Sequence, residues 1–149
     1  MEIFINKRFN GPPNSGNGGY VAGLIAKEIG KCCEVKLVAP PPLEKKLLLK
    51  KSNENYELYD DETLVCIANT TTVDNDPCEF VSFSDALLGS KNGLSKFEPI
   101  HALPDCFVCG PNRKEGDGLR LFTGPQDLDS NPSEDDLVST TWVPDKGLS

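Results

Sequence analysis

The sequence predicts an α+β fold, and three observations carry that prediction. A short strand candidate at residues 2–8 precedes one strongly apolar helical segment, which runs from Gly19 to about Ile29. Four segments with strand-like alternation then follow one another, joined by short turns. Strands in direct succession with short turns pair antiparallel, so we expect one helix packed against one antiparallel sheet.

The composition limits the classes of protein to which the chain can belong. Its 149 residues with 38% hydrophobic content are enough for a compact core. No apolar run approaches the ~20 residues that a bilayer-crossing helix needs, and the N-terminus lacks the apolar centre of a secretory signal. A formal charge of −8 argues against a main role in coating nucleic acid. We therefore expect a cytoplasmic protein with neither a membrane nor a nucleic-acid partner.

The basic side chains are concentrated near the N-terminus. Residues 1–52 carry nine basic and four acidic side chains, whereas the remainder is strongly acidic. Lys45 and Lys46 begin a basic stretch that ends at Lys51 and suits a small anionic ligand. The alternative is that these lysines are solvated on the faces of strands.

The helical segment follows a loop that regular structure does not tolerate. Residues 10–19 are rich in Gly, Pro and Asn, and they end in Asn17-Gly18-Gly19-Tyr20. The first turn of a helix leaves backbone amides unpaired, and glycines there let an incoming carbonyl oxygen approach them closely. A thioester oxygen that gains negative charge would be stabilised at such a place. The alternative is that Asn17 is a plain N-cap and that the glycines only let the chain turn.

The helix itself is apolar on nearly every face, so we expect it to be buried on most sides and to stop at Gly30. The strands expected after it cover residues 33–38, 43–51, 56–59 and 63–73, and a boundary is expected near residue 75. Beyond the boundary we expect a short helix at 80–88 capped by Ser82 or Ser84, an irregular loop at 89–118, and strands at 119–122 and 137–143.

The run from Arg8 through Asn17-Gly18-Gly19-Tyr20 to Ala26 resembles the entry loop and central helix of the hotdog-fold thioesterases. The closest resemblance is to the N-terminal repeat of the double-hotdog acyl-CoA thioesterases, and it covers about residues 5–73. It implies a curved antiparallel sheet around a central helix for residues 1–75, with 76–149 as an extension similar to an incomplete second hotdog. It also implies a homodimer that cleaves acyl-CoA thioesters with activated water and without a cofactor or metal.

One position departs from the pattern of that family. Many single-hotdog thioesterases carry a catalytic acid about two turns into the helix, where this chain has Ile25 and Ala26. An acid from elsewhere is then needed to place the water, and the candidates are Asp60, His101 and Asp117, of which His101 is the only histidine. In this interpretation the backbone amides of Gly18, Gly19 and Tyr20 hold the thioester oxygen, and Asn17, Lys45 and Lys46 also bind the substrate. The alternative is a module that binds acyl-CoA or an acyl group without catalysis.

A single Cys-x-x-Cys motif, Cys106 to Cys109, stands five residues after His101. A tetrahedral zinc site needs four protein ligands and no second such motif is present, so we expect no metal. A zinc knuckle completed by His101 and a distant ligand, a redox pair, and simple buried thiols all remain open. The six cysteines do not suggest a disulfide framework, because nothing indicates secretion.

Overall fold

The computed structural model describes residues 1–74, 79–129, 137–144 and 146. The chain divides into two compact units, Met1–Asp76 and Pro77–Ser149. No helix in the described ranges is long and apolar enough to cross a membrane.

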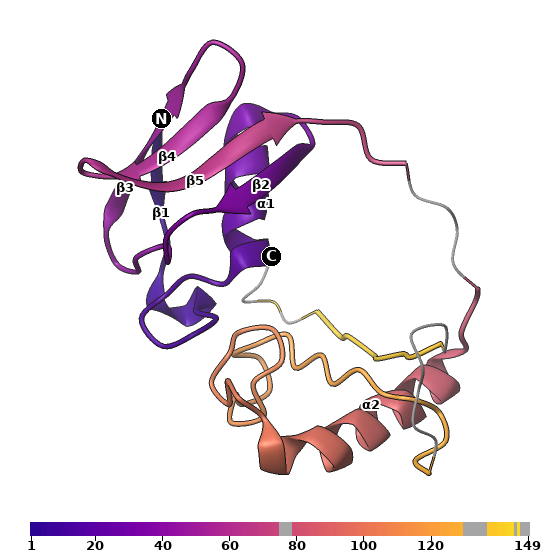
Figure 1. Ribbon diagram of the computed structural model, residues 1–149. Helices are drawn as coiled ribbons and strands as arrows, with labels where there is room; N and C mark the ends of the chain where they lie inside the picture. The colour runs from indigo at the N-terminus through magenta and orange to yellow at the C-terminus, as the bar shows by residue number, and fades with distance from the viewer. Residues whose placement is uncertain (75–78, 130–136, 145, 147–149) are drawn as a thin grey trace. The chain divides into compact units, whose positions relative to one another are not determined.

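The first unit is an α+β layer built on one five-stranded antiparallel sheet (Figure 1). The strand order is β1-β3-β4-β5-β2, and every neighbouring pair is antiparallel. The helix α1 (Gly18–Ile29) lies along one face of this sheet. The strands are β1 (Glu2–Phe4), β2 (Cys33–Leu37), β3 (Lys46–Lys51), β4 (Tyr56–Asp60) and β5 (Thr63–Thr70).

The core of this unit lies between α1 and the sheet, because alternate strand residues point at the helix. Leu49 on β3, Leu58 on β4 and Cys66 on β5 are neighbours across the sheet, and all of them are buried. The helix contributes Val21 and Ile25, whose spacing of four residues places them on one helical face. The alternation of buried and exposed residues along β3 shows that one face of this strand meets the helix.

The helix α1 is less enclosed than expected. Val21 and Ile25 are buried, most other residues of the helix are half-buried, and the exposed Gly19, Gly23 and Lys27 lie four residues apart on one face. The expectation of burial on most sides therefore holds only in part, because this one face of the helix remains exposed. The expected stop is confirmed: Gly30 adopts a left-handed φ of 74°, and its N–H donates to the Ala26 carbonyl.

Four of the five strands are shorter than the sequence suggested, and β4 is one residue longer. The first strand ends at Phe4 and is followed by a 3-10 turn, Lys7–Phe9, in which the Asn6 side chain accepts from the Arg8 N–H. The third begins at Lys46 and not at residue 43, because Glu44 has a φ of 57° that no strand residue adopts. The fifth ends at Thr70.

The second unit is organised around a long helix, α2 (Phe83–Phe97), followed by a 3-10 turn at Glu98–Ile100. Ser82 is the N-cap, and its Oγ accepts from the Asp85 N–H at 3.2 Å. The expected loop over 89–100 is therefore wrong. Gly89, Ser90, Asn92 and Gly93 are weak helix formers, but here they form the buried face of α2.

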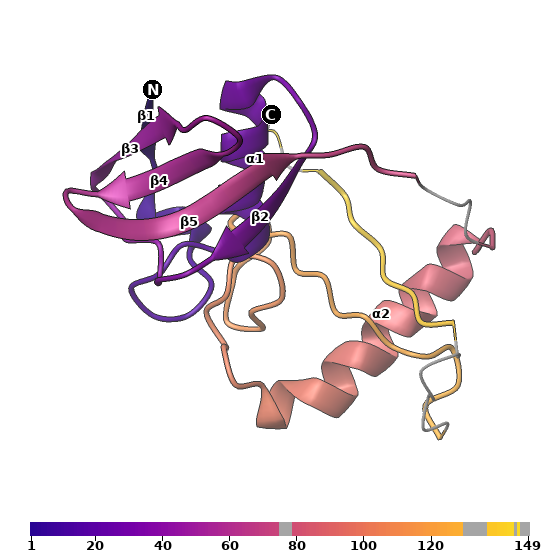
Figure 2. The ribbon, with the colours of Figure 1, turned by 45° about the horizontal axis from the view of Figure 1, so that its top comes forward.

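The extended segments around residues 121–126 and 137–143 both run along α2 (Figures 1 and 2). A Cβ at Gly89 would lie 2.7 Å from the Ser139 carbonyl oxygen, and one at Gly93 would lie 2.5 Å from that of Phe122. The Ser90 Oγ accepts from the Thr141 N–H at 2.7 Å. The expected strands at 119–122 and 137–143 are wrong for the described residues, where the two segments share only the bridge Gly124–Ser139.

Candidate functional site

The loop before α1 is held in place by backbone hydrogen bonds on both of its sides. Gly16 N–H donates to the Pro41 carbonyl at 2.8 Å, and Asn17 N–H donates to the Phe9 carbonyl at 2.8 Å. Gly11 N–H closes the loop on itself by donating to the Ser15 carbonyl at 2.9 Å. This Gly- and Pro-rich segment therefore positions the start of α1 against the segment that follows β2.

The first turn of α1 presents two backbone amides that no protein oxygen occupies in the described part of the chain. The Asn17 Oδ1 accepts from the Tyr20 N–H at 3.1 Å, so this third amide is taken by the cap. No oxygen of the described residues accepts from the amides of Gly18 or Gly19. The expectation that Tyr20 also offers its amide to a ligand is therefore wrong, because the N-cap asparagine satisfies it first.

The Tyr20 ring is fixed beside this turn. It stacks on Phe9 with ring centroids 3.9 Å apart and an interplanar angle of 9°, and the Arg8 guanidinium lies 5.9 Å from the Phe9 ring centre. Burial raises the pKa of the Tyr20 hydroxyl above its ordinary value. The phenol therefore stays protonated at neutral pH and cannot serve as a base there.

A hollow of about 400 Å³ adjoins the start of α1 in the first unit. Apart from Ser15, its lining is apolar or backbone: Pro12, Pro13, Ser15, Gly16, Gly18, Leu37, Val38, Ala39, Pro40 and Pro41. Gly18 belongs to both features, because it lines the hollow and carries one of the two unoccupied amides. This hollow was not predicted from the sequence. The proline-rich segments that line both of its sides were the feature of the sequence that could have indicated an apolar surface there.

Among the described residues, no carboxylate or imidazole lines this hollow. Ile25, at the helix position where an acid was sought, is fully buried in the core. Asp60 lies at the turn between β4 and β5, where it forms an ion pair with Lys45. The hydrogen bond to Asp60 raises the pKa of Lys45, and a second bond to Asp61 adds to that effect.

The two candidate lysines are both paired with carboxylates of the same unit. Lys45 contacts Asp61 at 2.9 Å as well as Asp60, and Lys46 contacts Glu2 at 2.9 Å. Neither lysine lines the hollow beside Gly18. Their assignment to substrate binding stays a prediction, and the structure gives both of them an alternative partner.

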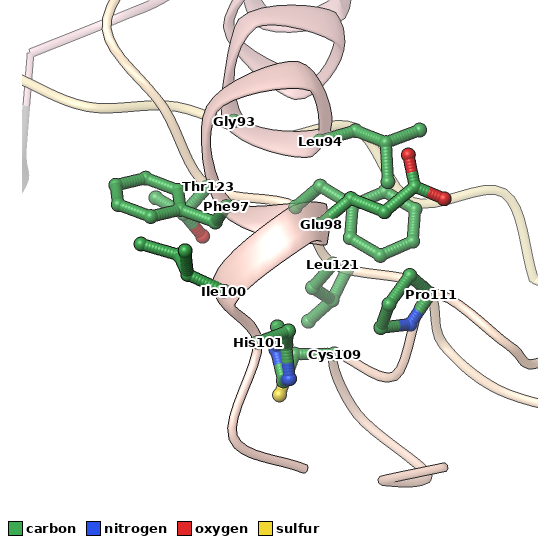
Figure 3. Close-up of a pocket in the computed structure, with 11 residues that line it drawn as sticks. Gly93, Leu94, Phe97, Glu98, Ile100, His101, Cys109, Pro111, Leu121 and Thr123 are labelled. Atoms are coloured by element: carbon green, nitrogen blue, oxygen red, sulfur yellow. The ribbon is translucent and has the colours of Figure 1, made fainter. Parts of the chain in front are cut away.

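The other two candidates, His101 and Asp117, belong to the second unit and are not hydrogen-bonded to each other. The His101 Nδ1 accepts from the Leu103 N–H at 3.1 Å, and Asp117 pairs with Arg113 at 3.0 Å. His101 lines a second hollow, of about 360 Å³, against the end of α2 (Figure 3). Leu94, Phe97, Ile100, Leu121 and Phe122 make most of its wall, and Cys109 shares the lining with His101.

Burial is the main cause that raises the pKa of Cys109 to about 11, and the neighbouring Cys106 thiol adds to it. An activated nucleophile would need the opposite shift of its pKa. Within the described ranges, no three His, Cys, Asp or Glu side chains come together as metal ligands.

Compared with known protein families, curated proteins and solved structures, the chain shows no significant match. The interpretation of the site therefore depends on its own geometry.

Proposed function

We propose that the Met1–Asp76 unit is a hotdog-type module that binds an acyl thioester, with acyl-CoA as the expected ligand. The observation that carries the proposal is the place of Gly18, whose unoccupied amide borders an apolar hollow. The thioester carbonyl accepts from the Gly18 and Gly19 amides, where the helix dipole adds partial positive charge. The acyl chain enters the hollow between the proline-rich segments.

Binding is favoured over hydrolysis for this unit. Amides at a helix start also stabilise the oxyanion formed when water attacks a thioester, which keeps a thioesterase-like activity as the second candidate. Hydrolysis further needs a group that activates water, and the described lining of the hollow beside Gly18 has neither a carboxylate nor an imidazole. Asp60 is engaged by Lys45. We therefore expect tight binding with little release of free thiol from a panel of acyl-CoAs.

The variant Gly18→Pro tests the carbonyl contact. Gly18 is the first residue of α1, where proline is well accepted, and Asn17 before it has φ −63° and ψ 129°, the extended conformation that proline requires. Proline deletes the amide hydrogen and leaves the helix intact. We expect acyl-CoA affinity to fall about threefold to tenfold, the value of one hydrogen bond, by calorimetry.

Gly18→Ala is the matched control, because it adds a Cβ and keeps the amide. That Cβ meets only the flexible end of Leu37, at 3.2 Å. An alkyl-CoA thioether, which has no carbonyl, should bind both variants equally. Equal acyl-CoA affinities of Gly18→Pro and Gly18→Ala would contradict the proposal, and release of thiol by the unaltered chain would favour the hydrolase.

A further inference from the structure

The Cys-x-x-Cys turn of the second unit brings two thiols near each other. The Cys106 side chain is buried, with 4% of its surface exposed, and Cys109, three residues later in the same turn, is half-buried. Both cysteines are present as thiols. Two cysteines three residues apart within one turn need little movement to bring their sulfurs to bonding distance.

The backbone of this turn has little freedom to separate the two sulfurs. Cys106 N–H donates to the Leu103 carbonyl at 3.0 Å, and Gly110 N–H donates to the Cys106 carbonyl at 2.8 Å. A Cβ at Gly110 would lie 2.5 Å from the Cys106 nitrogen and 2.6 Å from the Pro104 carbonyl oxygen. The chain therefore doubles back on itself closely, and the fold keeps the thiols at a high effective concentration.

Only one of the two thiols opens on a space that a reagent can enter. Cys109 lines the hollow of about 360 Å³, and Cys106 does not. Figure 3 shows the Cys109 sulfur and the His101 ring at the same end of this hollow, below the apolar side chains of α2. A small uncharged molecule suits such a wall better than a charged one, because the wall is largely apolar.

We propose that Cys106 and Cys109 are a dithiol–disulfide pair that a small, uncharged organic disulfide oxidises by way of this hollow. The Cys109 thiolate attacks one sulfur of the reagent, whose S–S bond breaks, and the departing thiolate takes up the proton that Cys109 lost. The Cys106 thiolate then attacks the Cys109 sulfur, and the second half of the reagent leaves as a thiol. The protein loses two hydrogens, and the reagent is reduced to two thiols.

This pair is distinct from the acyl-binding proposal, which concerns the other unit. Oxidation can therefore fail while acyl-CoA binding succeeds, and the reverse also holds. Because the pKa of Cys109 is raised, its attack on the reagent should become faster as the pH rises.

The test uses the full chain as a C32S/C33S/C78S variant, which removes the exposed Cys32, its neighbour Cys33, and Cys78, a residue outside the described ranges. The probe is 2-hydroxyethyl disulfide at graded ratios to its own thiol. After an acid quench and alkylation, mass spectrometry of the peptide that contains both cysteines gives the fraction of disulfide. The same titration in concentrated urea gives the value for the unfolded chain.

We expect the folded chain to favour the disulfide at least about tenfold more than the unfolded chain, because the turn already holds the sulfurs together. The further substitution Gly110→Ala should reduce that ratio toward the unfolded value, because its Cβ forces the turn open. A folded chain that forms the disulfide no better than the unfolded one would overturn the proposal. So would a product that stops at a mixed disulfide on Cys109.

Discussion

Asn17 shows how a single side chain decides what the start of α1 offers to a ligand. Its Oδ1 takes the Tyr20 amide and leaves those of Gly18 and Gly19 to other acceptors. The same contact fixes the residue at which the helix begins. The first turn of α1 thus divides its amide donors between the N-cap, which takes that of Tyr20, and the proposed ligand site, which uses those of Gly18 and Gly19.

Replacing Asn17 by alanine should cost about 1 kcal/mol of stability, the usual value of an N-cap. The reason is that the Tyr20 N–H loses its acceptor. Urea unfolding followed by far-ultraviolet circular dichroism measures the loss. Asn17→Asp keeps an oxygen in the same place and should restore most of it, whereas equal stability of the alanine variant and the unaltered chain would show that the cap contributes nothing.

Cys66 makes the first unit sensitive to alkali. Burial in the core between the sheet and α1 raises the pKa of this thiol from 9.0 to about 11. Because the folded pKa is the higher one, the stabilising contribution of the thiol is complete below pH 9 and is lost as the pH rises toward 11. Between pH 9 and pH 11 the unfolded chain loses the Cys66 proton before the folded chain does, so a rising pH favours the unfolded state.

Cys66→Ala removes this dependence at the cost of a small cavity. The difference in unfolding free energy between Cys66→Ala and the unaltered chain should narrow by roughly 2 kcal/mol between pH 8 and pH 11, which corresponds to a shift of about two pKa units. Urea titrations at a series of pH values measure it. A difference that stays constant across the series would mean that the thiol is not shielded from solvent.

At the level of elements, α2 depends on glycine for its packing and α1 does not. Gly89 and Gly93 let two extended segments lie against the backbone of α2. A Cβ added at Gly23 on α1, by contrast, would meet no heavy atom within 4 Å in the described part of the chain, apart from its own helix backbone. Glycine therefore permits close packing on α2, whereas at Gly23 on α1 a side chain would meet no neighbour in the described residues.

Gly89→Ala should destabilise the packing on α2 by about 1–3 kcal/mol, because its Cβ would lie 2.5 Å from the Ser139 Oγ and 2.9 Å from the Gly124 carbonyl oxygen. Trp142, the only tryptophan, follows the segment bonded to Ser90 and reports this change by fluorescence during unfolding. Gly23→Ala is the control and should stabilise α1 by about 0.5–1 kcal/mol. A Gly89→Ala variant as stable as its parent would show that the segments are not held against the helix.

The elements that the sequence predicted well are those whose signal is local. The start of α1 follows from Asn17 and the glycines, its end from Gly30, and the β-rich second half of the first unit from alternation. The C-terminal half of α2 was missed because Gly89, Asn92 and Gly93 disfavour a helix unless distant segments pack on them. At residues 137–143 the error was the opposite one. The sequence predicted a strand there, but the backbone forms only one isolated bridge in the described residues, from Ser139 to Gly124.

For the whole molecule, the first unit leaves surface that a second copy can cover. The strand β2 is at the edge of the sheet, and Leu37 and Val38 at its end are 42% and 52% exposed. The exposed Gly19 and Gly23 leave one side of α1 bare. We expect a homodimer, with light scattering giving twice the chain mass of 16.2 kDa at micromolar concentration. A single species of the chain mass would contradict this.

The candidate site was predictable only in part at this scale. The N-cap and the glycine amides at Asn17–Gly19 are adjacent in the sequence, so this part of the candidate site could be predicted from the sequence alone. The hollow beside it joins residues 12–18 to residues 37–41, which meet only once the sheet has formed. The candidate acids were chosen by residue type, and the structure shows Asp60 and Asp117 in ion pairs with Lys45 and Arg113.

The helix α2 has an unusual distribution of polarity, with consequences for the heat of unfolding. It buries Gly89, Ser90 and Asn92 while Phe83, Leu88 and Phe97 remain substantially exposed to water. Hydration of newly uncovered hydrocarbon is what gives unfolding its large positive heat capacity change. Melting of α2 uncovers mainly glycine and amide surface, so it should add little to that change. In a calorimeter the second unit would then give only a small step in heat capacity between its folded and unfolded baselines, and the first unit would supply most of the curvature of stability with temperature.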